Sequence, residues 1–255
     1  MTTNPYSAPA APVADPVTAA QGNFVPGGHG VAAGRGWSWI AEGWALFRAQ
    51  PWIWIAIWVV LVLLLVVLNV IPILGPIANS ILWPVFSAGL VLGCRSLEQG
   101  SGLEFGHLFA GFRERLGTLA GVGAVTLGIS MVIVLVVGFG VFGLQGLPGS
   151  RAAAPETAMT GALAGLVMLA LMTPLFMAMW FAPALVVLHE RGVLEAMKES
   201  FRGCLRNVVP FLVYGLAGAV LATLASIPLF LGWLVLGPVF VASIYASYRD
   251  IYFKS

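Results

Sequence analysis

The feature that most constrains this chain is a stretch of 46 residues, 49–94, without a charged side chain. As a helix this stretch would be about 69 Å long, at about 1.5 Å per residue. That length is enough for two crossings of a hydrocarbon core about 30 Å thick, with a turn between them. Prolines and a glycine place the turn at residues 71–76. Residues 207–248 repeat the pattern over 42 residues and turn near Pro228.

Two further uncharged segments, 116–150 and 157–188, are each long enough for one crossing. Only 9% of the residues are charged and 60% are hydrophobic, whereas about a quarter of a soluble domain is charged. The sequence therefore predicts an all-α membrane protein. Its six transmembrane helices are expected at about 52–71, 76–94, 117–140, 161–188, 208–227 and 230–248. The glycine-rich residues 138–149 leave three alternatives open, namely helix, loop or re-entrant segment.

The N-terminal residues 1–34 have a different composition, dominated by alanine, proline and glycine. They lack the basic start and the apolar run of a signal peptide. Such a segment buries too little apolar surface to offset its ordering entropy. We expect residues 1–34 to form a disordered cytoplasmic tail and residues 35–255 to form a helical membrane domain.

The distribution of basic residues predicts the orientation. With six crossings, eleven of the twelve Lys and Arg residues fall on one side and only Arg151 falls on the other. Lys and Arg are retained in the cytoplasm during insertion. The expected location is therefore the bacterial inner membrane, with both chain ends in the cytoplasm.

Three amphipathic segments ending in Phe-Arg, residues 37–48, 103–113 and 193–202, precede uncharged stretches. In the third, Val193, Met197, Phe201 and Leu205 recur at helical spacing. Such helices lie in the membrane interface, and their basic groups attract anionic headgroups by roughly 1 kcal/mol each. The recurrence suggests a threefold tandem pseudo-repeat. The candidate headgroup-contacting residues are Arg48, Arg113, Arg115, Lys198, Arg202, Arg206 and Arg249.

Asp, Glu, Lys, Arg and His are absent from all six predicted helices, which disfavours proton-coupled transport through a buried carboxylate. Asn69 and Asn79, on either side of the first turn, are candidate polar residues at the outer face. Most intramembrane polar groups bond a neighbouring helix instead. Cys94 and Cys204 are expected to be reduced thiols, and the histidines have no metal-ligand spacing. We predict no cofactor, no metal, no nucleic-acid partner and no enzymatic activity.

The residues around the fourth predicted helix carry a resemblance. Phe181, Ala182, Pro183 and Ala184 are followed by Gly192, Ala196, Ser200, Phe201 and Asn207. This pattern is similar to bacterial six-helix families that include YciC-like proteins and the membrane domain of glycerophosphoryl diester phosphodiesterases. The opening residues 34–47 and the ending residues 244–253 look like those of an uncharacterised proteobacterial member. The resemblance implies a helical inner-membrane domain without catalytic residues to carry over.

These observations favour a non-enzymatic accessory or scaffold protein, with the lipid bilayer and another membrane protein as partners. The alternative is a small permease, channel or lipid-handling protein, suggested by the repeat, the prolines and the basic interfacial residues. A third class, an enzyme with an interfacial site near His189, Glu190 and Arg191, has less support because no catalytic motif accompanies these residues.

Overall fold

The computed structural model of the protein describes residues 22–145 and 155–254, and most of them are helical. In chain order the elements are β1 (Asn23–Phe24), α2 (Arg35–Ala49), α3 (Pro51–Asn69), α4 (Leu74–Glu98), η1 (Phe105–Phe109), α5 (Ala110–Arg113), α6 (Leu116–Gln145), α7 (Pro155–Trp180), α8 (Ala182–His189), α9 (Val193–Arg206), α10 (Val208–Ser226), α11 (Trp233–Tyr252) and β2 (Phe253–Lys254).

Five of the described helical spans are long and apolar enough to cross a membrane, where the sequence predicted six. They are Pro51–Asn69, Leu74–Glu98, Leu116–Gly140, Met159–His189 and Val208–Ser226. The sixth predicted helix exists as α11, but its last turns carry Arg249, Asp250 and several tyrosines and serines. More than half of the α11 residues are buried against other helices. This helix is therefore the centre of the packed bundle, and the count of six crossings is not confirmed.

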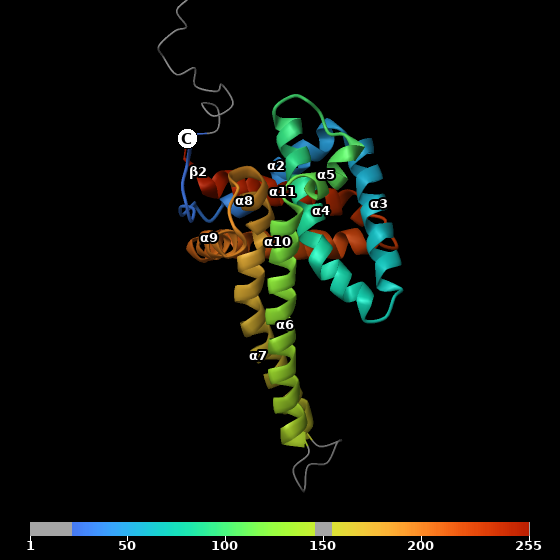
Figure 1. The fold of residues 1–255 in the computed structure, drawn as a ribbon, viewed down its shortest axis with the longest axis vertical. Helices are drawn as coiled ribbons and strands as arrows, with labels where there is room; N and C mark the ends of the chain where they lie inside the picture. The colour runs from blue at the N-terminus through green and yellow to red at the C-terminus, as the bar shows by residue number, and fades with distance from the viewer. Residues whose placement is uncertain (1–21, 146–154, 255) are drawn as a thin grey trace, which may run out of the picture.

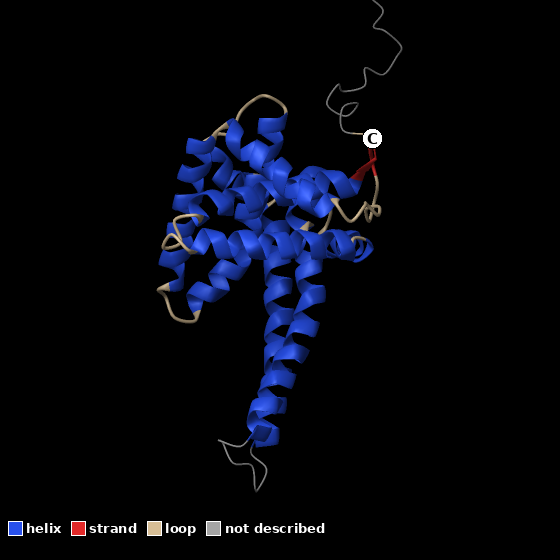
Figure 2. Cartoon of the chain, turned by 180° about the vertical axis from the view of Figure 1, so that it is seen from behind, coloured by secondary structure: helices blue, strands red, loops and turns tan. Residues whose placement is uncertain are grey.

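The longest helices, α6 and α7, form an antiparallel hairpin that projects beyond the other helices (Figure 1). The α9, α10 and α11 helices run across the direction of this hairpin (Figures 1 and 2). At the projecting end, large apolar side chains are exposed on both helices, including Val136 and Phe139 of α6 and Leu163 and Leu166 of α7. The hairpin thus packs against the bundle only at the end where α6 begins and α7 ends.

The α2 and α11 helices form the most extensive pair in the fold. They approach closely because α2 has glycine at the crossing. A Cβ added to Gly43 would lie 2.6 Å from the Val239 carbonyl oxygen. Trp39 of α2 is fully buried, and its indole donates to Asp250 of α11 at 2.8 Å. Small residues that let helix backbones meet are a common device in membrane helix packing.

The third and fourth predicted helices differ from expectation at their ends. The helix α6 continues through Gln145, so residues 138–145 are helical and residues 146–149 lie outside the described chain. The predicted helix 161–188 is two helices, α7 and α8, separated at Phe181. Pro183 follows the break, and proline cannot donate the backbone hydrogen bond that a continuous helix would require.

Residues 22–34 form an extended strap instead of part of a disordered tail. The strand β1 pairs antiparallel with β2, with Asn23 opposite Lys254 and Phe24 opposite Phe253. The His29 amide donates to the Ile251 carbonyl at 2.9 Å. The rest of the predicted tail, residues 1–21, lies outside the described chain. The sequence did not indicate this docking, because the long-range hydrogen bonds of residues 22–34 are to residues more than 170 positions away.

The three amphipathic segments do not share one structure. Residues 37–48 and 193–202 lie in the α-helices α2 and α9, but residues 103–113 contain the short 3-10 helix η1 and one turn of α5. The threefold pseudo-repeat is therefore not confirmed. The buried face of α9 consists of Ala196, Met197, Glu199, Ser200, Gly203 and Cys204. Leu205, which was expected on the apolar face, is 55% exposed.

Candidate functional site

A network of ion pairs joins α2, α4 and α11. The Arg35 side chain donates to Asp250 at 2.7 Å and to Glu42 at 2.8 Å. The hydrogen bond to Asp250 is the main reason that the pKa of Arg35 is raised. Arg249 pairs with Glu42 at 3.3 Å and also with Glu98. Arg249 is therefore held by two carboxylates of the protein, and its predicted role in contacting headgroups is not supported.

The other predicted headgroup-contacting residues fall into two groups. Arg115 pairs with Glu190, and Arg206 donates to the Gly27 carbonyl of the strap at 3.3 Å. The second group is exposed and makes no ion pair with any described residue; its members are Arg48, Arg113, Lys198 and Arg202. The structure leaves these four cations available to a charged surface.

Asn207, at the junction of α9 and α10, holds the strap. Its side chain is fully buried and accepts a hydrogen bond from the Val31 amide at 2.8 Å. Its amide group donates to the carbonyls of His29 and Gly203, both at 2.8 Å. The sequence carried a signal for this role, since Asn207 is a polar residue that directly precedes an apolar helix, but not the identity of its partners.

Ser200 of α9 occupies the break between α7 and α8. Its hydroxyl donates to the Met177 carbonyl at 2.7 Å and accepts from the Phe181 amide at 2.9 Å. These are the backbone groups that a helix break leaves without an intrahelical partner. Unsatisfied backbone groups cost several kcal/mol in a membrane environment. By bonding both groups, Ser200 stabilises the break at this position.

His189, Glu190 and Arg191, the residues considered for an interfacial enzyme site, each have different partners. His189 hydrogen-bonds Tyr248 at 2.5 Å and stacks on Phe24 of the strap. Glu190 points away, with 78% of its side chain exposed, and pairs with Arg115. Arg191 lies over the Phe24 ring and pairs with Glu195 at 2.8 Å. Outside the gap at 146–154 and the first 21 residues, three or more His, Cys, Asp or Glu side chains nowhere gather as a metal site would require.

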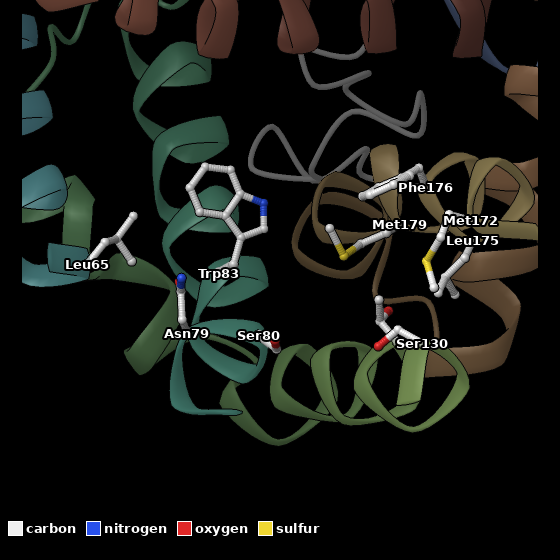
Figure 3. A pocket seen from close by; sticks show the side chains of 10 residues that line it. Leu65, Asn79, Ser80, Trp83, Ser130, Met172, Leu175, Phe176 and Met179 are labelled. Atoms are coloured by element: carbon white, nitrogen blue, oxygen red, sulfur yellow. The ribbon is translucent and has the colours of Figure 1, made fainter. Parts of the chain in front are cut away.

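The main candidate for a ligand site is a pocket of about 430 Å³ between α3, α4, α6 and α7, hereafter the polar pocket (Figure 3). Every lining residue belongs to one of four candidate spans. Polar side chains come from α4 and α6, and apolar ones come mainly from α7. The lining consists of Leu65, Asn79, Ser80, Trp83, Thr126, Ser130, Met172, Leu175, Phe176 and Met179.

The two asparagines predicted at the outer face are placed differently. The Asn69 amide is exposed and donates to the Leu65 carbonyl of its own helix at 2.7 Å. Asn79 lines the polar pocket and makes no hydrogen bond to any residue in the described ranges. The Asn79 side chain is half-buried, and an amide that meets lipid chains without a hydrogen-bond partner costs roughly 1–3 kcal/mol. Asn79 is thus the side chain in this pocket with the strongest requirement for a ligand or water.

A second pocket, of about 290 Å³, lies between α7, α9 and α10 and is more apolar. Trp180, Phe211 and Cys204 line it. Burial raises the pKa of the Cys204 thiol to about 12, so this cysteine is a protonated, unreactive group at neutral pH.

Comparison with known proteins gives a family and a relative. The family profile for a domain of unknown function, DUF7847, matches residues 112–248, more than half of the chain. A "probable inner membrane protein" of Burkholderia thailandensis is 28% identical over 207 residues, which cover 75% of this chain and 75% of that protein. No solved structure shows significant similarity. With the apolar helices, these matches identify a multi-pass helical membrane protein; they leave the resemblance to YciC-like proteins a prediction.

Proposed function

The chain belongs to the family defined by the domain of unknown function DUF7847, and on that premise we propose a non-enzymatic inner-membrane protein that assists other membrane proteins. We propose six crossings with both chain ends in the cytoplasm. The relative in Burkholderia thailandensis, called a probable inner membrane protein, supports the location. The similarity to YciC-like proteins and to the membrane domain of glycerophosphoryl diester phosphodiesterases forms part of the same proposal.

The pairing of β1 with β2 supports an even number of crossings. Asn23 and Lys254 are opposite each other in this pairing, so the strap and the C-terminal strand share one side of the membrane. Five crossings would separate them. The positive-inside rule makes this shared side the cytoplasmic one, because the four unpaired cations Arg48, Arg113, Lys198 and Arg202 belong to it under six crossings.

Labelling of the turn between α10 and α11 tests the number of membrane crossings. Leu229 in this turn is 87% exposed. In a variant without Cys94 and Cys204, Leu229→Cys should react with a membrane-impermeant maleimide added to the periplasmic side. Four crossings, with α10 and α11 along the membrane surface, would leave this cysteine unlabelled. That result would overturn six crossings and keep the even number.

The accessory role rests on the projecting end of the α6–α7 hairpin. Large apolar side chains cover it, and apart from the backbone of the same helix no described atom lies within 4 Å of a Cβ added to Gly138, Gly161 or Gly165. Gly161 and Gly165 are one helical turn apart and therefore share a face. In membranes, glycines at this spacing let a second helix approach closely. We infer that a transmembrane helix of another protein packs on this part of α7.

Cross-linking in membranes tests this interface. The double substitution Gly161→Leu/Gly165→Leu should abolish a cross-linked partner that the unmodified protein shows, because two leucines would keep a second helix at a distance. Leu163→Ala is the matched control, since position 163 lies on the opposite face of α7. Equal cross-linking in both variants, or a purified protein with no stoichiometric protein partner, contradicts the accessory role.

The polar pocket favours a second candidate function, a small permease or lipid-handling protein. Its unpaired Asn79 amide and its hydroxyl groups lie among apolar residues of four candidate spans. Reconstituted protein in liposomes would then move a solute or a fluorescent lipid faster than protein-free liposomes do. Equal rates would leave the accessory role as the proposed function.

A further inference from the structure

The polar groups of the polar pocket differ in what they offer to a ligand. The hydroxyls of Ser80 and Thr126 donate to the carbonyls of their own helices, at 2.9 Å to Pro76 and 2.8 Å to Val122. Ser130 does the same toward Leu127 at 2.9 Å. Their hydrogens are therefore used, and the hydroxyl oxygens remain as acceptors.

Asn79 and Trp83 supply the donors. Neither side chain bonds another residue in the part of the chain that the structure describes, although both line the pocket from the same face of α4. The Asn79 amide offers two N–H groups and one acceptor, and the Trp83 indole offers one N–H group. A matching ligand therefore has at least one hydroxyl, which can donate to an oxygen, and carbonyl oxygens, which can accept.

The opposite wall is apolar. Met172, Leu175, Phe176 and Met179 of α7 face the asparagine and tryptophan across the pocket (Figure 3). Phe176 is 58% exposed, so the pocket extends to the surface of the hairpin that bilayer lipids reach. Flexible thioether side chains adapt to chains of varied shape. The wall suits an acyl chain that enters from the membrane.

The lining contains no charged residue. A phosphate or carboxylate in this pocket would have no cation among the lining residues to pair with, and an unpaired charge among apolar side chains is strongly disfavoured. The volume of about 430 Å³ is within the usual range of about 300–1,000 Å³ for ligand sites. The ligand is therefore uncharged and of lipid type, with its polar part at α4 and α6.

We propose that the polar pocket binds one neutral glycerolipid of the diacylglycerol class, with its free hydroxyl and ester carbonyls at Asn79 and Trp83 and an acyl chain along α7. Diacylglycerol has a hydroxyl donor that matches the acceptor oxygens of the lining and carbonyl acceptors that match the N–H groups of Asn79 and Trp83. This binding requires neither the accessory role nor transport, because it depends only on the pocket and the surrounding bilayer.

Asn69 provides a matched control for Asn79. Both are asparagines near the turn between α3 and α4, but the Asn69 amide already donates to the Leu65 carbonyl and lies outside the polar pocket. Asn69→Leu and Asn79→Leu make the same chemical change in the same region. Only the second removes a group that faces the proposed lipid.

The test is native mass spectrometry of the full chain in a mild detergent that contains 1,2-dioleoylglycerol. The unmodified protein and Asn69→Leu should each retain one dioleoylglycerol, and Asn79→Leu should retain about fivefold less, the effect of one lost neutral hydrogen bond. Ser130→Phe, which fills the pocket from α6, should also lose it. Circular dichroism and thermal unfolding confirm that each variant is folded.

Two further lipids test whether the bound ligand belongs to the diacylglycerol class. Trioleoylglycerol has no hydroxyl, and dioleoylphosphatidylglycerol carries a phosphate, so both should compete poorly with dioleoylglycerol. Equal retention of dioleoylglycerol by all four proteins, or none by the unmodified protein, overturns the proposal. Equal binding of either competing lipid overturns the assigned class. If Gly161→Leu/Gly165→Leu loses the protein partner and still binds dioleoylglycerol, then the accessory role and the lipid binding are independent of each other.

Discussion

The attachment of the strap at Asn207 makes a quantitative prediction. The substitution Asn207→Leu keeps the branched shape and the number of side-chain heavy atoms of asparagine and removes all three of its hydrogen bonds. Two of these hydrogen bonds join the strap, from the Val31 amide and to the His29 carbonyl, both at 2.8 Å. The third, to the Gly203 carbonyl, is a local bond at the end of α9 and does not involve the strap. The change therefore acts mainly on the docking of residues 28–31.

The expected magnitude follows from these two bonds. A neutral hydrogen bond contributes about 1 kcal/mol net, because the separated groups bond water instead. Two bonds give about 2 kcal/mol, which corresponds to a change of about 30-fold in the opening equilibrium of the strap. The full penalty of a buried unsatisfied group does not apply, since the strap lies at the surface and its freed groups reach water when it opens.

Hydrogen–deuterium exchange measured by mass spectrometry can follow this opening. In Asn207→Leu, peptides that contain Val31 should exchange about 30-fold faster than in the unmodified protein. Peptides of α11 should exchange as before. Asn207→Asp is an informative companion, because a carboxylate can still accept from the Val31 amide but cannot donate to His29. It should give an intermediate rate.

Unchanged exchange at Val31 in Asn207→Leu would refute this reasoning. It would mean that β1, the contact between Phe24 and His189, and the Arg206 bonds hold the strap without Asn207. Equal acceleration throughout α11 would also refute it, because the substitution would then unfold the bundle instead of releasing the strap.

Two other substitutions test the packing of α2 and α9. Gly43→Ala should lower the thermal unfolding temperature in detergent, because its Cβ would lie 2.6 Å from the Val239 carbonyl oxygen, whereas Gly128→Ala, with nothing within 4 Å, should not. Burial, opposed by the nearby Arg191, raises the pKa of Glu199. The folded state then keeps a proton that the unfolded state has released, so stability should fall as the pH rises from the ordinary glutamate pKa of about 4.3 through the higher pKa of the folded state, and this fall should be smaller in Glu199→Gln.

The sequence predicted the features that depend on composition over many residues. Uncharged stretches located the long apolar helices, since the cost of charge in a bilayer acts on every residue of a span. Prolines and glycines marked the turn before α4, because these residues interrupt a helix locally. The six separate crossings were harder to predict, because α11 combines an apolar first half with Arg249 and Asp250, and its burial depends on contacts with α2.

The candidate site could be predicted only in part. Asn79 was identified as an unusual residue because an amide in an apolar segment is rare, and the structure places it in the polar pocket. Arg249 was assigned to headgroups on the same type of argument, yet it pairs with Glu42 and Glu98. The type of a residue shows whether it requires a polar partner. The identity of that partner depends on how α2, α4 and α11 are rotated against one another.

The break at Phe181 shows why such pairings are difficult to read from sequence. Proline at position 183 predicts a disturbed helix, but a disturbed helix in a membrane is stable only if its freed backbone groups find partners. Ser200 provides both, through the Met177 carbonyl and the Phe181 amide. The amphipathic pattern of α9 placed larger apolar residues on the inner face, whereas packing requires a small hydroxyl residue there. Ser200 is thus explained by the break in a different helix, and only the folded arrangement joins the two.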